Sequence, residues 1–197
     1  MGGGGKVSLE GVSAGGSINT ISATRTGGSW FKKYHKTGGM PDEANIDHWD
    51  YAPSQEVFDE IFRVSKNQII WGGNYFNLPA TRCFNVWRKL SISENFSMAM
   101  AEYCWLSFDD NAKVFDYAPQ DKSRFHPTQK PLKLIEKQLS LYSNEGDLIL
   151  DCFSGSGTTA VACHNLNRNF ICIEKDYTYY TKSVERLENA QAQQKLF

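Results

Sequence analysis

Residues 148–159, with the sequence Leu-Ile-Leu-Asp-Cys-Phe-Ser-Gly-Ser-Gly-Thr-Thr, constrain the fold of this chain more than any other stretch. The three branched apolar residues predict a short buried strand, with Asp151 at its carboxyl end. Gly155 and Gly157 allow a tight turn close to a ligand, because glycine has no Cβ. The segment Thr158–Leu166 that follows contains Ala and Val and favours a helix. Strand, glycine turn and helix in this order predict the nucleotide-binding corner of a doubly wound α/β sheet.

Two acids indicate which nucleotide this corner would take. Glu174 ends a second apolar run about 20 residues after Asp151, where such folds hold ribose hydroxyls. Gly155, Gly157 and Ala160 fit the G-x-G-x-x-G/A spacing, so a dinucleotide-dependent oxidoreductase stays open as a weaker alternative. However, Asp151 would repel a pyrophosphate held at the helix N-terminus. S-adenosylmethionine has no phosphate and carries an ammonium and a sulfonium, so the acid favours S-adenosylmethionine.

A second motif, Arg-Phe-His-Pro-Thr-Gln-Lys-Pro at residues 124–131, precedes an amphipathic segment. Pro131 is well placed to start a helix over Leu132–Tyr142. The residues expected on its buried face recur at helical spacing; they are Leu134, Ile135, Leu139 and Tyr142. The two motifs, in this order and spacing, resemble the amino-group DNA methyltransferases, the adenine-N6 and cytosine-N4 enzymes. The resemblance runs from about His48 to Phe197 and includes Phe58–Phe76, which is similar to the phage-type members.

The resemblance implies an α/β, Rossmann-like sheet that binds S-adenosylmethionine, with the catalytic half before the cofactor half. It implies methyl transfer to an exocyclic base amine, adenine N6 above all, in double-stranded DNA with a flipped target base. It also implies a place in bacterial or phage restriction-modification and a cytoplasmic location.

Cofactor contacts are expected from both motifs. The expected cofactor-binding residues are Asp151, Phe153, Ser154, Gly155, Gly157, Thr158, Glu174, His126, Thr128, Gln129 and Lys130. Phe153 would pack on the adenine of the cofactor, and Glu174 would hold its ribose. His126 would lie near the cofactor or cap the next helix.

A strand end upstream is the candidate pocket for the flipped base. Its residues are Trp71, Gly72, Gly73, Asn74, Tyr75 and Phe76. Ligand crevices open at strand ends in such sheets, so Tyr75 or Phe76 could stack on the base. Core packing of the same aromatics is an equal alternative.

The chain departs from the resemblance at the catalytic motif, which is Asp-Pro-Pro-Tyr or a close variant. The six prolines are Pro41, Pro53, Pro79, Pro119, Pro127 and Pro131, and no two are adjacent. The catalytic residues are therefore unassigned. The glycine-rich start resembles the loop after that motif, so we expect an N-terminally truncated chain. It would be completed by an N-terminal fragment or a homodimer partner, or it would be an inactive cofactor- or DNA-binding remnant.

Composition agrees with one compact domain. The chain has 197 residues, of which 41% are hydrophobic. We expect a glycine-rich loop or tail over 1–47, with short ordered pieces at most, and a methyltransferase domain over 48–197. Within it, 109–123 is polar, and we expect it to be irregular and to serve as a short target-recognition insert. Further elements are expected from hydrophobic periodicity: strands over Gln68–Trp71, Arg82–Lys89 and Met98–Phe108, and helices over Ser54–Ser65 and Tyr177–Gln191.

Charge and cysteine usage narrow the class further. The net charge of −1 gives no global attraction to DNA, so phosphate contacts would need local basic clusters such as Lys130, Lys133 and Lys137. The five cysteines form no C-x-x-C pair, so we expect no metal site and a reduced, cytosolic protein. No apolar run approaches the roughly 20 residues of a membrane span.

Overall fold

A computed structural model describes residues 18–24, 52–90, 92–93, 99–119 and 124–194 of the chain, the first of these ranges as backbone only. The described strands are β1 (Ile18–Thr24), β2 (Ser65–Trp71), β3 (Phe84–Lys89), β4 (Ala101–Leu106), β5 (Lys113–Tyr117), β6 (Leu148–Asp151) and β7 (Asn169–Cys172). The helices are α2 (Gln55–Val64), α3 (Leu132–Tyr142), α4 (Thr158–Asn165) and α5 (Tyr177–Gln194), with a 3-10 turn, η2 (Gly73–Tyr75).

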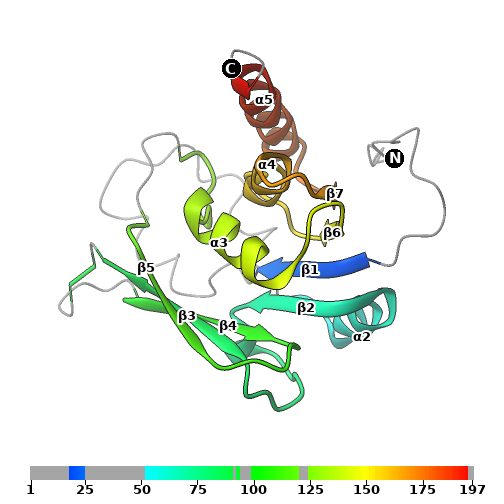
Figure 1. The fold of residues 1–197 in the computed structure, drawn as a ribbon, viewed down its shortest axis with the longest axis vertical. Coiled ribbons are helices and arrows are strands. Elements are labelled where there is room, and N and C mark those ends of the chain that lie inside the picture. Colours follow the sequence, from blue (N-terminus) through cyan, green and yellow to red (C-terminus); the bar gives the residue numbers. More distant parts are fainter. Residues whose placement is uncertain (1–17, 25–51, 91, 94–98, 120–123, 195–197) are drawn as a thin grey trace.

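The described strands form one sheet in the order β5-β3-β4-β2-β1-β6-β7 (Figure 1). Within it β4 is antiparallel to both of its neighbours, and every other pairing is parallel. From β1 the chain proceeds outward to β2, and from β6 it proceeds outward to β7 in the opposite direction. The strand order therefore reverses between β1 and β6. In open α/β sheets, ligands bind at the carboxyl ends of the strands at such a point.

Helices cover both faces of the sheet (Figure 1). The larger core lies against α3 and α4, and it includes Trp71, Trp87 and Ile149. The smaller core lies against α2, and it includes Leu150. Ile149 and Leu150 are neighbours on β6 and enter opposite cores, because successive side chains of a strand point to opposite faces. The result is the Rossmann-like α/β sheet expected from the sequence.

The two predicted helices around the site are confirmed. Helix α3 spans Leu132–Tyr142 as the periodicity predicts, and its four expected core residues are all buried. Helix α4 begins at Thr158, directly after the glycine turn. Helix α2 is also present; the Ser54 hydroxyl does not cap it, and the Ser54 carbonyl accepts a hydrogen bond from the Val57 N–H at 3.2 Å.

Two strands lie in segments predicted to be irregular. Strand β1 comes from the expected loop or tail over 1–47 and lies inside the sheet, between β2 and β6. The rest of 1–47 falls outside the described residues. Strand β5 lies within 109–123, so the prediction of an irregular segment there was wrong. It pairs with β3 at the sheet edge, with Phe115 buried and Val114 exposed, an alternation that its polar neighbours in the sequence concealed. Within the described ranges no helix is both long and apolar enough to span a bilayer.

Candidate functional site

The two sequence motifs meet at the carboxyl end of β6. One pocket is lined by both of them, and its residues are His126, Thr128, Gln129, Lys130, Ile135, Asp151, Phe153, Ser154, Gly155, Ser156, Thr158 and Thr159. A hydrogen bond joins the motifs directly, because the Thr158 hydroxyl donates to the Lys130 carbonyl at 3.4 Å. The pocket lies beside the reversal point of the sheet, since Asp151 pairs with Ser22 of β1. Nine of the eleven predicted cofactor residues line it; Gly157 and Glu174 do not.

Asp151 braces the turn that follows it. One carboxylate oxygen accepts a hydrogen bond from the Phe153 N–H at 3.0 Å, and the other accepts one from the Thr159 hydroxyl at 2.5 Å. The residue is almost fully buried. Burial raises the pKa of Asp151 to about 6, although these hydrogen bonds and the Lys130 charge partly oppose the shift. At neutral pH the carboxylate is thus charged, and because it is buried its attraction for a cation is stronger than it would be in water.

The glycine turn requires glycine at two positions. Gly155 and Gly157 have φ angles of 52° and 70°, in the left-handed region that favours glycine. A Cβ on Gly155 would lie 3.2 Å from the His126 ring, and a Cβ on Gly157 would lie 2.9 Å from the Cβ of Ser183 on α5. The turn is therefore enclosed by the second motif on one side and by α5 on the other.

Glu174 follows β7 and holds the same turn from outside the pocket. One carboxylate oxygen accepts a hydrogen bond from the Gly155 N–H at 2.7 Å, and the other accepts one from the Asp176 N–H at 2.9 Å. A carboxylate offers about four lone pairs. Glu174 therefore keeps acceptor capacity for ligand hydroxyls while it fixes Gly155.

His126 is a neutral imidazole at ordinary pH. Burial, together with the charges of Lys130 and Arg124, lowers the pKa of His126 to about 4. Its Nδ1 accepts a hydrogen bond from the Thr128 N–H at 3.2 Å, so the proton of the neutral ring is on Nε2. Because Nε2 faces Gly155, this N–H belongs to the wall of the pocket rather than to a cap of α3.

Lys130 links the pocket to the candidate base-binding segment. Its ammonium lies 5.0 Å from the centre of the Trp71 ring and 3.5 Å from a carboxylate oxygen of Glu102. The other oxygen of Glu102 pairs with Lys89 at 2.7 Å. Burial acts to raise the pKa of Glu102, but the two ammonium groups outweigh it and hold that pKa below its ordinary value. The buried network thus carries two positive charges and one negative charge.

The structure divides the predicted base pocket into core and surface. Trp71 is buried and packs edge-to-face on Trp87. Phe76 packs on Phe58, with ring centres 4.5 Å apart. Asn74 and Tyr75 are exposed, Tyr75 to 62%.

The two glycines of this segment make the chain turn at the end of β2. Gly72 has a left-handed φ of 71°. Gly73 lies so close to Trp105 that a Cβ would come within 2.5 Å of its side chain. With this geometry Tyr75 is exposed, whereas Trp71 is buried and Phe76 is half-buried.

Sequence reasoning missed several residues of the site. Three further residues line the pocket, namely Ile135, Ser156 and Thr159. Ser156 and Thr159 lie within the motif at 148–159, and Ile135 lies in the helix after the second motif, so their positions in the sequence could have predicted that they line it. Three α5 residues, Tyr179, Ser183 and Arg186, contact the motifs as well. No local pattern distinguishes these three residues from any other residue of an amphipathic helix.

Comparisons of the sequence with known proteins identify its family. A family model described as DNA methylase, of the N6 and N4 type, matches residues 29–185. The type II methyltransferase M2.MboI of Moraxella bovis is 48% identical over 144 residues, which cover 72% of this chain and 48% of that protein. The type II methyltransferase M.HpaI of Haemophilus parainfluenzae is 47% identical over 64 residues, or 32% of this chain and 20% of that protein. The chain thus spans about half the length, or less, of these curated relatives.

Solved structures share the fold at low sequence identity. A crystal structure of an M1.HpyAVI–SAM complex aligns with a TM-score of 0.59 and 21% identity, and the alignment covers 87% of this chain and 90% of that one. The PvuII DNA methyltransferase, described as cytosine-N4-specific, aligns with a TM-score of 0.57 and 14% identity, covering 89% and 85%. At these identities the likeness shows the fold alone.

Proposed function

The chain belongs to the DNA methylase family, and from this premise we propose that it acts as a DNA methyltransferase with S-adenosylmethionine as methyl donor. The proposed acceptor is an exocyclic base amine in double-stranded DNA, adenine N6 in preference to cytosine N4 because adenine is the commoner target in the family. The observation that carries the proposal is the single pocket built from both motifs, with a buried carboxylate beside its glycine turn.

The donor set of the pocket suits S-adenosylmethionine. Asp151 would supply a buried anion for the ammonium, and Glu174, which holds the turn from outside the pocket, would supply spare acceptors for ribose hydroxyls. The Ser154 hydroxyl is buried and has no hydrogen-bond partner within the described part of the chain. One neighbour is the Cys172 thiol, whose pKa the hydroxyl acts to lower against the larger effect of burial. A buried polar group of this kind is satisfied when a ligand supplies the partner. The pyrophosphate of a dinucleotide would instead meet the Asp151 charge.

The residues of this chain would bind and orient the donor. S-adenosylmethionine, when bound, supplies a methyl group activated by the sulfonium charge. His126 lines the pocket and, as a neutral imidazole, adds no positive charge that would repel the sulfonium. Phe153 is half-buried beside the turn, where it would pack on the adenine ring. Such orientation supplies much of the rate when two reactants must be aligned.

Tyr75 is the residue we propose to contact the flipped base. It is an exposed aromatic at the carboxyl end of β2, and the neighbouring Trp71 is linked to the cofactor pocket through Lys130. Stacking on an aromatic ring is a general way to hold an extrahelical base. The polar strand-and-loop segment 109–123, whose described part ends at Pro119, remains our candidate for target recognition.

A second candidate function is cofactor or DNA binding without methyl transfer. It is favoured by one observation, the absence of any adjacent proline pair and hence of Asp-Pro-Pro-Tyr among the 197 residues. In the family that motif accepts hydrogen bonds from the target amine and stacks on the base. Binding of the donor does not depend on those groups, whereas activation of the acceptor does.

Transfer of a labelled methyl group separates the two candidates. The protein is incubated with labelled S-adenosylmethionine and unmethylated double-stranded DNA, and the DNA is digested to nucleosides. Label in N6-methyladenine supports the proposal as stated, and label in N4-methylcytosine corrects the acceptor. Binding of S-adenosylhomocysteine in calorimetry without any transfer to DNA would favour the second candidate.

A further inference from the structure

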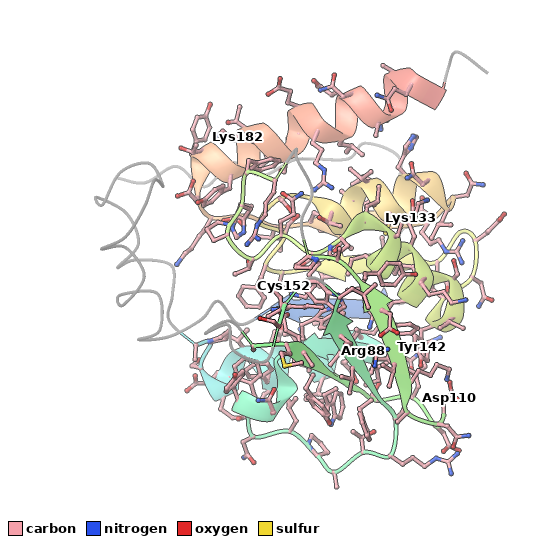
Figure 2. The ribbon with its side chains drawn as sticks, turned by 90° about the vertical axis from the view of Figure 1, so that its left-hand side faces the viewer. Arg88, Asp110, Lys133, Tyr142, Cys152 and Lys182 are labelled. Carbon is pink, nitrogen blue, oxygen red and sulfur yellow. The ribbon has the colours of Figure 1, made fainter. Side chains whose placement is uncertain are left out.

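Helix α5 lies along the cofactor pocket without lining it. Tyr179, Ser183 and Arg186 are spaced four and three residues apart, so they share one face of the helix. All three contact the motifs that build the pocket, and none is among the pocket residues. Figure 2 labels Lys182 on this helix, at the end of the molecule opposite Arg88 and Asp110.

Arg186 holds the glycine turn and the first turn of α4. One guanidinium nitrogen, Nη1, donates to the Ser156 carbonyl at 3.0 Å, to the Ser156 hydroxyl at 3.3 Å and to the Thr158 hydroxyl at 2.9 Å. The Thr158 hydroxyl in turn donates to the Lys130 carbonyl. The guanidinium is therefore two hydrogen bonds away from the second motif.

The other residues of this face fix the two sides of the pocket. The Tyr179 ring packs edge-on against the His126 ring, with centres 4.2 Å apart. The Ser183 Cβ lies where it leaves no room for a side chain on Gly157. Lys182, next to this face, places its ammonium 5.9 Å from the Phe125 ring. The His126 ring itself lies against Gly155. The two motifs therefore contact each other, and each of them also contacts α5.

Helix stability does not account for the position of Arg186. The positive end of the α4 dipole is at Thr158, and a cation there is unfavourable for the helix. Two of the acceptors named above belong to Ser156 in the turn, and the third is the hydroxyl of Thr158, the first residue of α4. The geometry is that of a brace on the turn.

We propose that Tyr179, Ser183 and Arg186 are positioning residues that hold the two motifs in the cofactor-binding arrangement, so that α5 sets the affinity of the site from outside it. This inference rests on the proposed function, because the affinity concerned is that for S-adenosylmethionine and its product. Arg186 carries the largest part, since it alone contacts the turn through several hydrogen bonds.

The test compares Arg186→Ala with Arg186→Lys, and with Glu188→Ala as a control at an exposed position of the same helix. Two readouts are used: hydrogen exchange of the amides of residues 154–158 and calorimetric affinity for S-adenosylhomocysteine. Arg186→Ala is expected to speed exchange in this turn and to weaken binding about 10-fold, the effect of losing a charge-assisted hydrogen bond. Arg186→Lys keeps the charge and a donor nitrogen but loses the planar guanidinium, so it should recover part of both the slow exchange and the affinity. Glu188→Ala should match the parent protein.

The outcomes are distinguishable from those of the proposed function. Unchanged exchange and unchanged affinity in Arg186→Ala would overturn the inference, as would faster exchange with undiminished affinity. An equal loss in Glu188→Ala would also overturn it, because the effect would then belong to the helix as a whole. If the parent protein does not bind S-adenosylhomocysteine, the proposed function fails, while the exchange readout still tests whether Arg186 holds the turn.

Discussion

The two halves of the site are built by different kinds of contact. Around β6 and β7, polar groups from distant segments meet the backbone of one turn: Asp151, Glu174 and Arg186 each hydrogen-bond to it. Around the end of β2, aromatic rings pack on one another, and Trp71 and Phe76 belong to the hydrophobic cores. The first half is therefore organised before a ligand arrives. In the second half Asn74 and Tyr75 are exposed, and Tyr75 is the exposed aromatic residue of the segment.

The largest loss of binding and stability is expected at Gly157 in the cofactor half, where there is no space for a side chain. Gly157→Ala would require a left-handed φ for alanine and would press its Cβ against Ser183. We expect loss of measurable S-adenosylhomocysteine binding and a decrease of about 2–4 kcal/mol in the free energy of unfolding, from left-handed strain plus overpacking. Calorimetry and urea denaturation measure the two quantities.

Gly146→Ala is the matched control for this substitution. Gly146 also has a left-handed φ, of 80°, but nothing lies within 4 Å of a Cβ placed there. It should therefore show the backbone strain alone, about 1–2 kcal/mol, with cofactor affinity intact. If the two variants behave alike, the contact with α5 has no part in the effect.

The next effect concerns the charge of Asp151. Asp151→Asn keeps an acceptor for the Phe153 N–H but removes the anion, and we expect S-adenosylhomocysteine to bind about 10- to 100-fold more weakly at pH 7.5, the range for a hydrogen bond to a charged group. Since the pKa of Asp151 is raised to about 6, affinity in the parent protein should fall as the pH decreases from 7.5 to 5. Calorimetry across this range in the Asn variant should show no such fall.

Protein stability has the opposite pH dependence at this residue. The folded pKa of Asp151 lies above its ordinary value of 3.8, so folding favours the protonated form. The contribution of Asp151 to stability is thus greatest below pH 4 and is lost as the pH rises to about 6. Asp147→Asn, at the other end of β6, serves as a control for charge. Asp147→Asn should keep the fall in affinity with decreasing pH that the parent protein shows. If Asp151→Asn also keeps that fall, the titrating group is not Asp151.

A smaller effect is expected in the aromatic half, and it concerns stability alone. Phe76→Ala removes the ring that packs on Phe58 and should lower the free energy of unfolding by about 1–2 kcal/mol, less than for a fully buried ring because Phe76 is half-buried. Cofactor affinity should not change. Thermal denaturation with and without S-adenosylhomocysteine measures both. A loss of cofactor affinity would mean that the two halves are coupled more tightly than their contacts indicate.

The smallest effect is expected for Tyr75→Ala. Exposed substitutions change stability by less than about 0.5 kcal/mol, and cofactor affinity should stay the same. Affinity for DNA should fall about 5-fold, the lower end of the range for losing one stacked base. Fluorescence anisotropy with a labelled duplex that contains a mismatched adenine measures this. If DNA affinity is unchanged, Tyr75 is not part of the base pocket.

The difference between the two halves explains which parts of the fold and the site could be predicted from the sequence. The cofactor half needs particular residue types at fixed spacing, namely glycines with positive φ, an acid at a strand end and an acid one strand later. Strand β6, helix α3 and most of the pocket could therefore be predicted. Strand β1 could not, because Ile-Asn-Thr-Ile-Ser-Ala-Thr shows no period-two alternation of apolar residues, and its place in the sheet depends on pairing with β2 and β6.

The remaining misses share a physical cause, which is that contacts across the fold leave no local pattern. Strand β5 was hidden by polar flanks and is defined by its pairing with β3. Arg186 reads as an ordinary helix residue, and its role depends on where α5 lies relative to the glycine turn. The sequence left two alternatives for Trp71 and Phe76, a base pocket and core packing, because periodicity is the same for both. Their burial and ring packing in the structure favour the core.

The most direct test of the central claim is calorimetric titration of the protein with S-adenosylhomocysteine and, separately, with NAD at pH 7.5. We expect saturable binding of S-adenosylhomocysteine and no binding of NAD, because Asp151 attracts an ammonium and repels a pyrophosphate. Binding of NAD without binding of S-adenosylhomocysteine would contradict the account and would make the glycine turn a dinucleotide site.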